Sequence, residues 1–325
     1  MTPPASAPSE ASGPAHRVAV VGAGAVGGFY GGMLALAGVP VTLVARAAQV
    51  DAITRDGLAI VRADRRDVAR VAATTEIPAI RSSDVVLVCV KSPDTREVAI
   101  AIAPHLAPGA TVVSLQNGVA NADVLAEGLP GVVLASVVWV GVSMDAPGVV
   151  RHAGRGDLEL GVARSGAGRP GASARAREIG AMFERAGVPC PVRDDIDAAL
   201  WRKLITNCAF NAVSALGRAR YGRMAAEPAV RGLMETVIGE AVAVARASGV
   251  EIDERSMIAS VWNTAAAMST QHSSTAQDIV RGKRTEIDML NGFVADRGEA
   301  LGVPVPVNRA LHALVRLREA GDDLA

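Results

Sequence analysis

Aromatic side chains are scarce in this chain: they make up 3% of its 325 residues, although 50% of the residues are hydrophobic. Alanine, valine and leucine must therefore fill the core. The hydrophobic content, together with only 20% charged residues, excludes a chain that is disordered throughout. At roughly 150 residues per domain, the length predicts about two domains, each able to bury its own core.

An excess of charge of either sign is also missing, because 33 Lys and Arg residues balance 33 Asp and Glu residues. The sequence has no sustained basic stripe that could neutralise a phosphate backbone. Nucleic acid is therefore not an expected partner.

Cysteine is rare, and Cys89, Cys190 and Cys208 lie far apart among apolar neighbours. We expect neither a disulfide framework nor a thiolate metal site, and this cysteine usage fits a reducing, cytoplasmic location. The five histidines form no i, i+4 pair and have no carboxylate at metal-ligand spacing, so no metal is expected.

Residues 1–15 are rich in Pro, Ser and Ala and lack the pattern of a signal peptide, which predicts a disordered tail. Residues 18–45 then form a 28-residue run without a charge, long enough on paper to span a bilayer. Seven glycines, Pro40 and two changes of period argue against a membrane helix. We expect no membrane association.

Strand-like and helix-like segments alternate through the first half of the chain. A strand at 17–21, a helix at 25–37 and a strand at 41–45 form a βαβ unit. Further strands are predicted at 84–90, 111–115, 132–140, 149–152 and 157–162, with a helix at 95–106. Strands separated by helices predict a Rossmann-type parallel sheet, which binds ligands at its carboxyl edge.

The second half is predicted to be all helical. The expected helices span 174–186, 195–216, 228–248, 255–268, 275–301 and 308–319. The change of pattern places a domain boundary near residues 189–193, where Pro191 interrupts the regular structure. The predicted fold class is α/β, with a tail at 1–15, a Rossmann-type sheet domain at 16–192 and an all-helical domain at 193–325.

A glycine-rich turn follows the first predicted strand and opens the first predicted helix. Its residues fit G-x-G-x-x-G and are Gly22, Ala23, Gly24, Ala25, Val26 and Gly27. The first glycine allows a tight turn, the second lets backbone N–H groups approach a pyrophosphate, and the third lets the helix pack close to the strand. A tightly packed glycine helix without a ligand is the alternative, but the strand–turn–helix context favours dinucleotide binding at the helix N-terminus.

Arg46 follows the second strand of this unit, where an acidic residue would hold the ribose hydroxyls of NAD. A guanidinium can bind a 2′-phosphate through paired N–H donors, so this position favours NADP(H). Lys91, just past the strand at 84–90, would lie over the same sheet edge. A solvated loop arginine and an ordinary surface lysine are the alternatives.

A polar stripe follows a helix that is otherwise apolar around much of its circumference. Lys203, Asn207 and Asn211 are spaced by four, so each step leaves a drift of roughly 40° and the three share one face. Burial without partners would cost several kcal/mol, so something polar must meet them. Alternatively, the stripe faces solvent or pairs with another helix.

Three further positions complete the candidate set. Asn117 follows the strand at 111–115, although Asn-Gly alone is typical of a simple turn. Ser274 and Gln277 fit a capping box, and a serine at a helix N-terminus is also well placed to hold a substrate carboxylate. Glu286 would lie about three turns further along the same helix, where a surface carboxylate is its simplest interpretation.

Glu286 also stands in a longer motif, Thr285-Glu286-Ile287-Asp288, which is followed by Asn291-Gly292. With these residues, the glycine turn, Asn117, Ser274 and the lysine-asparagine-asparagine helix, the sequence resembles ketopantoate reductases (2-dehydropantoate 2-reductases) over residues 17–315. The resemblance implies a Rossmann domain that binds NADPH and an all-helical domain that closes over it.

The resemblance also implies roles for the helical half. Lys203 would be the general acid that protonates the carbonyl oxygen as hydride leaves the nicotinamide. Glu286 would contact the terminal hydroxyl of the substrate or the lysine. Asn207, Asn211 and Ser274 would orient the substrate and its carboxylate.

In the first half, the resemblance places Asn117 between cofactor and substrate and makes Arg46 and Lys91 basic contacts to the adenosine phosphate. The implied activity is NADPH-dependent reduction of 2-dehydropantoate to (R)-pantoate, on the route to pantothenate and coenzyme A. A paralogous reductase of another 2-oxo acid and a non-catalytic NADP(H) sensor are the alternatives. The oligomeric state stays open, a homodimer included.

Overall fold

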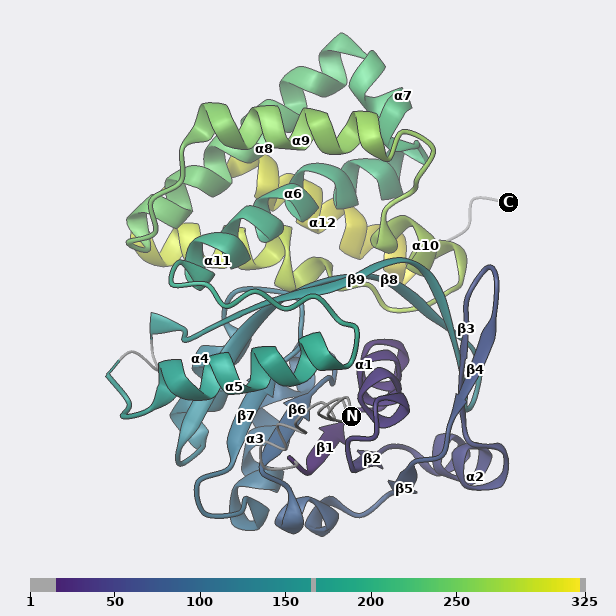
Figure 1. Ribbon diagram of the computed structural model, residues 1–325. Helices are drawn as coiled ribbons and strands as arrows, with labels where there is room; N and C mark the ends of the chain where they lie inside the picture. Colours follow the sequence, from purple (N-terminus) through teal and green to yellow (C-terminus); the bar gives the residue numbers. More distant parts are fainter. Residues whose placement is uncertain (1–15, 165–167, 322–325) are drawn as a thin grey trace, which may run out of the picture.

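A computed structural model of the chain describes residues 16–164 and 168–321. The tail expected at residues 1–15 lies outside the described residues. Figure 1 shows a sheet flanked by helices in the lower half of the molecule and helices alone in the upper half. The predicted order, a sheet domain followed by an all-helical domain, is confirmed.

One sheet organises the first half of the chain. Its strands are β1 (Val18–Val21), β2 (Val41–Val44), β3 (Leu58–Val61), β4 (Arg66–Ala69), β5 (Ala72–Thr74), β6 (Val85–Val88), β7 (Thr111–Ser114), β8 (Val132–Ala146) and β9 (Val149–Gly161). They lie in the order β4-β3-β9-β8-β7-β6-β1-β2-β5. The hairpins β3–β4 and β8–β9 pair antiparallel, so the sheet is mostly rather than wholly parallel.

Continuous aliphatic runs build the central strands. β1 reads VAVV and β6 reads VVLV, and every side chain of both strands is buried. Parallel strands that are covered on both faces require such runs. The uncharged stretch at 18–45 thus divides into β1, helix α1 (Ala25–Leu36) and β2. Among the described residues, no helix is long and apolar enough to cross a membrane.

Strands β8 and β9 are much longer than the others, and Figure 1 shows them arching between the sheet and the helical half. Their pairing shifts register between Trp139 and Val140 and again between Gly141 and Val142. The sequence predicted that β8 would end at residue 140 and that β9 would be two separate stretches. Both predictions were wrong, because the partner strand maintains the pairing through glycines and polar residues that break the apolar pattern.

The remaining elements are helices. Around the sheet lie α1, α2 (Ala47–Asp56), α3 (Thr95–Ile102), α4 (Asn121–Gly128) and α5 (Ala172–Arg185), with 3-10 turns η1 (Ile77–Ser82), η2 (Ser92–Asp94) and η3 (Ala103–His105). The helical half contains α6 (Ile196–Gly217), α7 (Tyr221–Ala226), α8 (Pro228–Ala247), α9 (Glu254–Ala267), α10 (Ser274–Val280), η5 (Ile287–Met289), α11 (Asn291–Leu301) and α12 (Pro306–Ala320).

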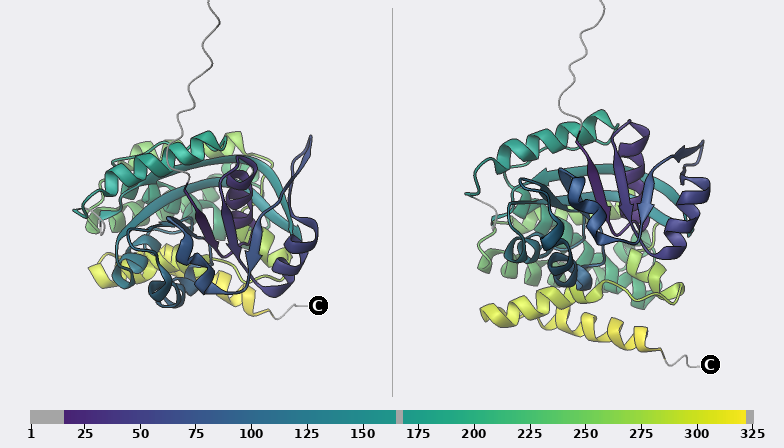
Figure 2. Two further views of the ribbon diagram at one scale, coloured as in Figure 1. Left: turned by 60° about the horizontal axis from the view of Figure 1, so that its bottom comes forward. Right: turned by 90° about the horizontal axis from the view of Figure 1, so that it is seen from below.

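Helix α6 is the centre of the helical half. It packs against α8, α10 and α12, and its apolar residues from Trp201 onward belong to the core of the helical half, whereas Ile196, Ala199 and Leu200 pack into a core shared with the sheet. Figure 2 shows α12, in yellow, along the side of the molecule away from β1 and β2. Aliphatic side chains dominate all three core clusters of the described residues, as the composition predicts.

The sequence predicted a single helix at 275–301, and this prediction was wrong. Helix α10 ends at Val280, and Gly282 follows with φ of 62°, the left-handed conformation that commonly terminates a helix. A loop and η5 then lead to α11, so Glu286 lies in a loop rather than three turns along a helix.

Several short elements escaped the sequence prediction. The strands β3, β4 and β5 and the helices α2, α4 and α7 were not predicted. β4 reads RDVA and α2 is largely exposed and polar, so neither carries a strong apolar period. Tertiary pairing, such as that of β3 with β9, forms these elements where local sequence preference is weak.

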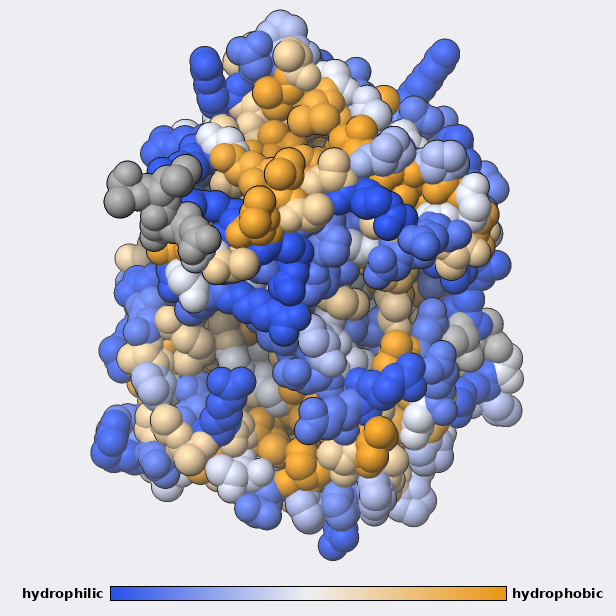
Figure 3. All heavy atoms as spheres, turned by 180° about the vertical axis from the view of Figure 1, so that it is seen from behind, coloured by the Kyte–Doolittle hydropathy of each residue, from blue (hydrophilic) through white to orange (hydrophobic). Residues whose placement is uncertain are grey.

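Viewed from behind, hydrophilic residues cover much of the molecule, and hydrophobic residues gather over the helical half (Figure 3). Large apolar side chains that are individually exposed include Val280 and Leu317. Single exposed apolar residues are normal on a protein surface.

The contact between α1 and β1 yields a stability prediction. A Cβ atom at Gly27 would lie 2.5 Å from the carbonyl oxygen of Gly22 and 2.9 Å from Val20 Cγ1. We expect Gly27→Ala to destabilise the protein by about 1–3 kcal/mol, the cost of overpacking, which lowers Tm by several degrees. Thermal unfolding followed by circular dichroism measures it.

Gly232→Ala is the matched control, because Gly232 is exposed on α8 and a Cβ there meets no atom within 4 Å. This variant should raise Tm slightly, since alanine is favoured over glycine in a helix by about 1 kcal/mol. A Gly27→Ala variant as stable as Gly232→Ala would contradict the close packing.

Candidate functional site

The glycine turn between β1 and α1 is shaped for close approach of a ligand. Gly22 adopts φ of 95°, and a Cβ there would lie 2.8 Å from the backbone nitrogen of Val90. A Cβ at Gly24 would meet no atom within 4 Å, so the space beside this residue is open. The first turn of α1 has no side-chain cap and no acidic residue. These features fit an anionic pyrophosphate at the helix N-terminus.

Arg46 lies where β2 ends, at the N-cap of α2, and its side chain is exposed. Within the described part of the chain its guanidinium has no hydrogen-bond or ion-pair partner. An arginine that is free at the carboxyl edge of the sheet can bind a phosphate without breaking an existing contact.

Four of the predicted residues form one hydrogen-bonded chain across the two halves of the molecule. Lys203 Nζ on α6 donates to Asn117 Oδ1 at 2.8 Å. Asn117 Nδ2 donates to Glu286 Oε2 at 3.0 Å, and Lys91 Nζ donates to Glu286 Oε1 at 3.1 Å. Lys203 also donates to the carbonyl oxygen of Val138 on β8. The polar stripe of α6 thus begins against the carboxyl edge of the sheet rather than in solvent.

Hydrogen bonds from neighbouring elements fix the backbone of Asn117, in addition to the turn in which it lies. Its carbonyl oxygen accepts hydrogen bonds from Asn121 Nδ2 at 2.6 Å and from Ser92 Oγ at 3.0 Å. Asn121 also donates to Ser92 Oγ, and Thr95 Oγ1 donates to Asn121 Oδ1. This buried network was not predicted from the sequence, because its members are single polar residues at the ends of separate elements.

The surroundings of Lys203 shift the pKa of its side-chain ammonium. Burial lowers the pKa of its ammonium to about 8, the Glu286 carboxylate opposes that shift, and the Arg155 guanidinium adds to it. Below pH 8 Lys203 therefore carries a proton, and it releases that proton more readily than an exposed lysine does.

The other polar residues of the stripe lie further along α6. Asn207 is half-buried and Asn211 is 3% exposed. Ser273 Oγ donates to the carbonyl oxygen of Asn211 at 3.2 Å, which fixes the start of α10 against α6. The start of α10 therefore lies against α6 at Asn211.

Ser274 is not the cap of α10. Ser273 is the N-cap, and its side chain accepts a hydrogen bond from the backbone nitrogen of Ala276 at 3.1 Å. The predicted capping box of Ser274 and Gln277 is therefore one residue out of register. Ser274 is exposed in the first turn, and capping does not use its hydroxyl group.

Trp139 is a further site residue that was not predicted from the sequence. Lys203 Nζ lies 5.4 Å from the centroid of its ring, and Trp139 Nε1 donates to Glu159 Oε1 at 2.8 Å. Arg155 Cζ lies 4.5 Å from the same ring. Nothing in the linear pattern indicated this cluster, because the register shifts of β8 and β9 bring it together.

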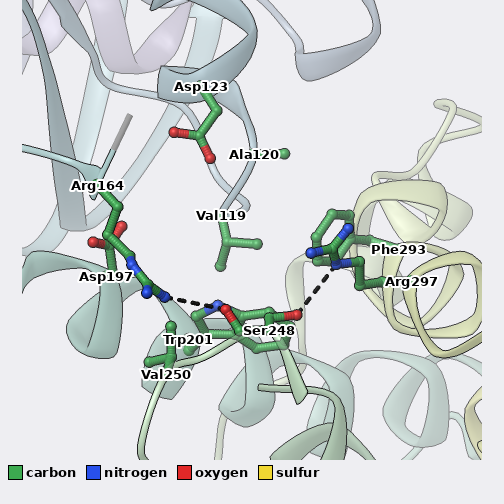
Figure 4. Close-up of a pocket in the computed structure, with 10 residues that line it drawn as sticks. All are labelled: Val119, Ala120, Asp123, Arg164, Asp197, Trp201, Ser248, Val250, Phe293 and Arg297. Atoms are coloured by element: carbon green, nitrogen blue, oxygen red, sulfur yellow. Dashed lines mark hydrogen bonds between the residues drawn. The ribbon is translucent and has the colours of Figure 1, made fainter. Parts of the chain in front are cut away.

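A cavity of about 220 Å³ opens elsewhere, between α4, α6 and α11 (Figure 4). Its lining comprises Val119, Ala120, Asp123, Arg164, Asp197, Trp201, Ser248, Val250, Phe293 and Arg297. None of the predicted site residues is among them. Asp123 and Asp197 both lie in it, and burial and the charge of Asp123 raise the pKa of Asp197.

Comparison with known proteins matches both halves of the chain. The family model described as ketopantoate reductase PanE/ApbA matches residues 18–165, and the model of the C-terminal part of that family matches residues 195–319. The 2-dehydropantoate 2-reductase of Halobacterium salinarum is 36% identical over 307 residues, which are 93% of this chain and 99% of that protein.

Solved structures are similar to this chain over most of its length. The chain is similar to a PanE/ApbA family ketopantoate reductase from Ralstonia eutropha JMP134, with 47% identity, a TM-score of 0.85 and coverage of 94% of this chain and 98% of that one. D-mandelate dehydrogenase, solved with NADH and anilino(oxo)acetate, shares the fold with a TM-score of 0.85 over 94% of this chain and 98% of that one, at 22% identity.

A dinucleotide-type glycine turn at the edge of a mostly parallel sheet, closed by a helical half that supplies a lysine, defines a two-domain oxidoreductase. The chain belongs to the ketopantoate reductase PanE/ApbA family. The family assignment made from the sequence is thereby confirmed.

Proposed function

We propose that this protein reduces 2-dehydropantoate to (R)-pantoate with NADPH, a step toward pantothenate and coenzyme A. The observation that carries the proposal is the Lys203 ammonium held at 2.8 Å by Asn117, beside the Glu286 carboxylate and at the carboxyl edge of the sheet. The 2-dehydropantoate 2-reductases that match the chain over most of its length support the choice of substrate.

The reaction adds a hydride to the carbonyl carbon and a proton to the carbonyl oxygen. Bound NADPH would supply the hydride. Lys203 donates the proton from Nζ, and its positive charge stabilises the oxygen as negative charge develops there. A pKa of about 8 suits this task, because the group is protonated at neutral pH yet gives up its proton readily.

The remaining polar groups orient the substrate. Glu286 accepts a hydrogen bond from the terminal hydroxyl of the substrate and keeps Lys203 charged. Asn207 and Asn211 contact the substrate from α6, and the free hydroxyl of Ser274 binds its carboxylate. Asn117 lies between cofactor and substrate, since it already contacts both Lys203 and Glu286.

The glycine turn and two basic residues bind the cofactor. Residues 22–27 receive the pyrophosphate on the N-terminus of α1, which the open space beside Gly24 supports. Arg46 binds the 2′-phosphate of NADPH, and Lys91 assists at the adenosine phosphate once it leaves Glu286. In this proposal residues 16–192 form the cofactor domain and residues 193–325 the substrate domain.

Lys203→Ala tests the proton-donor role. We expect turnover of ketopantoate to fall by about 10²–10⁴-fold, the usual contribution of a positioned acid, while the NADPH Kd stays within about twofold. Stopped-flow oxidation of NADPH measures turnover, and nicotinamide fluorescence measures binding. Arg202→Ala is the control, because Arg202 is the neighbouring cation on α6 and pairs instead with Asp195 at 2.6 Å. Equal turnover in both variants would remove Lys203 from the reaction.

Arg46→Ala tests the cofactor choice. Hydrogen bonds to charged groups are worth about 1.5–3 kcal/mol, so the Kd of NADPH should rise roughly 10–150-fold while that of NADH stays unchanged. Isothermal titration calorimetry with both cofactors measures this difference. Arg55→Ala, on the exposed end of α2, removes a charge that is paired with Asp56 and serves as the control. Similar losses for NADPH and NADH would refute the 2′-phosphate contact.

A further inference from the structure

Arg155 has a backbone conformation that is unfavourable for its side chain. It adopts φ of 51°, and within the described residues only one other non-glycine residue, Arg218, has a positive φ. Gly154 and Gly156 flank Arg155, and the three residues lie where β9 shifts register against β8. A glycine at position 155 would adopt this conformation without strain. Strained backbone of this kind clusters at functional sites.

The Arg155 side chain points to the neighbourhood of Lys203. Two hydrogen bonds to Asp157, at 3.0 and 2.6 Å, fix the guanidinium group. Its Cζ atom lies 4.5 Å from the centroid of the Trp139 ring, and Lys203 Nζ lies 5.4 Å from the same centroid. Glu159 holds the indole N–H, so the aromatic ring is a fixed spacer that contacts both cations.

The other charged groups around Lys203 do not duplicate this contact. Glu286 approaches from the loop before η5 and binds Asn117 and Lys91. Glu159 is paired with Arg193, at 3.2 Å, as well as with Trp139. The histidine of β9, His152, faces the backbone carbonyl of Arg155 rather than Lys203. Arg155 is therefore the cation that shares an aromatic surface with the lysine.

We propose that Arg155 is a positioning residue for Lys203: it packs on the Trp139 ring against which the ammonium lies, and it places a second positive charge beside that ammonium. A nearby like charge disfavours the charged form of an ammonium, whereas the ring face attracts both cations and keeps them in place. The inference rests on the proposed role of Lys203 as the proton donor. A lysine whose pKa is lowered less by its surroundings is a weaker acid and would transfer its proton less readily near neutral pH.

The direction of the electrostatic effect agrees with the geometry. Burial is the main cause that lowers the pKa of Lys203 to about 8, and Arg155 lowers it further against the opposing influence of Glu286. Removal of the guanidinium would also leave the Asp157 carboxylate uncompensated. Both changes favour the protonated lysine, so they act in the same direction.

The composition of the chain allows a direct test. The sequence contains only three lysines, Lys91, Lys203 and Lys283. Protein labelled with ε-¹³C-lysine therefore gives three resonances, and a Lys203→Arg variant assigns the relevant one. Titration of the full-length protein without substrate or cofactor then reports the Lys203 pKa alone, independently of what the enzyme reduces.

In this titration Arg155→Gln should raise the Lys203 pKa by roughly half a unit, the scale of one partly exposed charge at several ångströms. Arg155→Lys keeps the charge and adds a fourth lysine resonance, and the Lys203 pKa in this variant should stay within about 0.2 unit of that in the unsubstituted protein. Arg155→Gly should raise the pKa as Arg155→Gln does, without loss of Tm, because glycine relieves the left-handed strain. Arg151→Gln, on the same strand and paired with Asp145, is the control and should leave the resonance unchanged.

The same variants should shift the pH profile of reduction. Since Lys203 acts while protonated, kcat/KM is expected to be lost as pH rises through about 8, and Arg155→Gln should move this basic limb upward by the shift seen in the titration. An unchanged Lys203 resonance in Arg155→Gln, or an equal change in Arg151→Gln, would overturn the inference even if the enzyme turns over. A shifted resonance in a protein that reduces no 2-oxo acid would instead contradict the proposed function.

Discussion

The hydrogen bond from the Lys203 ammonium to the Asn117 amide is the contact on which the site depends. A buried ammonium without partners is costly, and α6 alone offers Lys203 none: the acceptors are Asn117 and Val138, both from the sheet half. Glu286, from the loop that follows α10, completes the arrangement. The site therefore exists only where the helical half closes on the carboxyl edge of the sheet, and the two halves that the family models match separately form one chemical unit.

Much of the fold follows from local pattern. The buried runs of β1, β6 and β7 and the glycine turn were predicted because parallel strands covered on both faces need continuous aliphatic sequence. The predictions that failed concern elements that form through partners distant in the sequence. The glycines of β9 look like loop residues until β8 is seen beside them, and β4, with its sequence RDVA, becomes a strand only through its pairing with β3. Gly282 ended a helix that the apolar period alone would have continued to residue 301.

Some residues of the candidate site could likewise be predicted from the sequence, and others could not. The spacing of Lys203, Asn207 and Asn211 predicted a shared helix face. Asn117 and Glu286 were candidates from their positions in the sequence, the resemblance implied their roles, and hydrogen bonds link them to Lys203 in the structure. Trp139 and Arg155 could not be found from the sequence, because a register shift rather than a motif brings them to Lys203. Ser92 and Asn121, which hold the Asn117 backbone, were missed because each is an ordinary polar residue until the ends of β6 and β7 meet.

The most direct test of the proposed function is the decrease in NADPH absorbance when purified protein is mixed with ketopantoate, with NADH, pyruvate and 2-oxoisovalerate in parallel reactions. We expect rapid oxidation that is confined to NADPH with ketopantoate. Turnover of another 2-oxo acid in place of ketopantoate would retain the proton chemistry of Lys203 but contradict the proposed substrate. No oxidation with any of these acids, in a protein that binds NADPH, would contradict the assignment as a reductase of this substrate class.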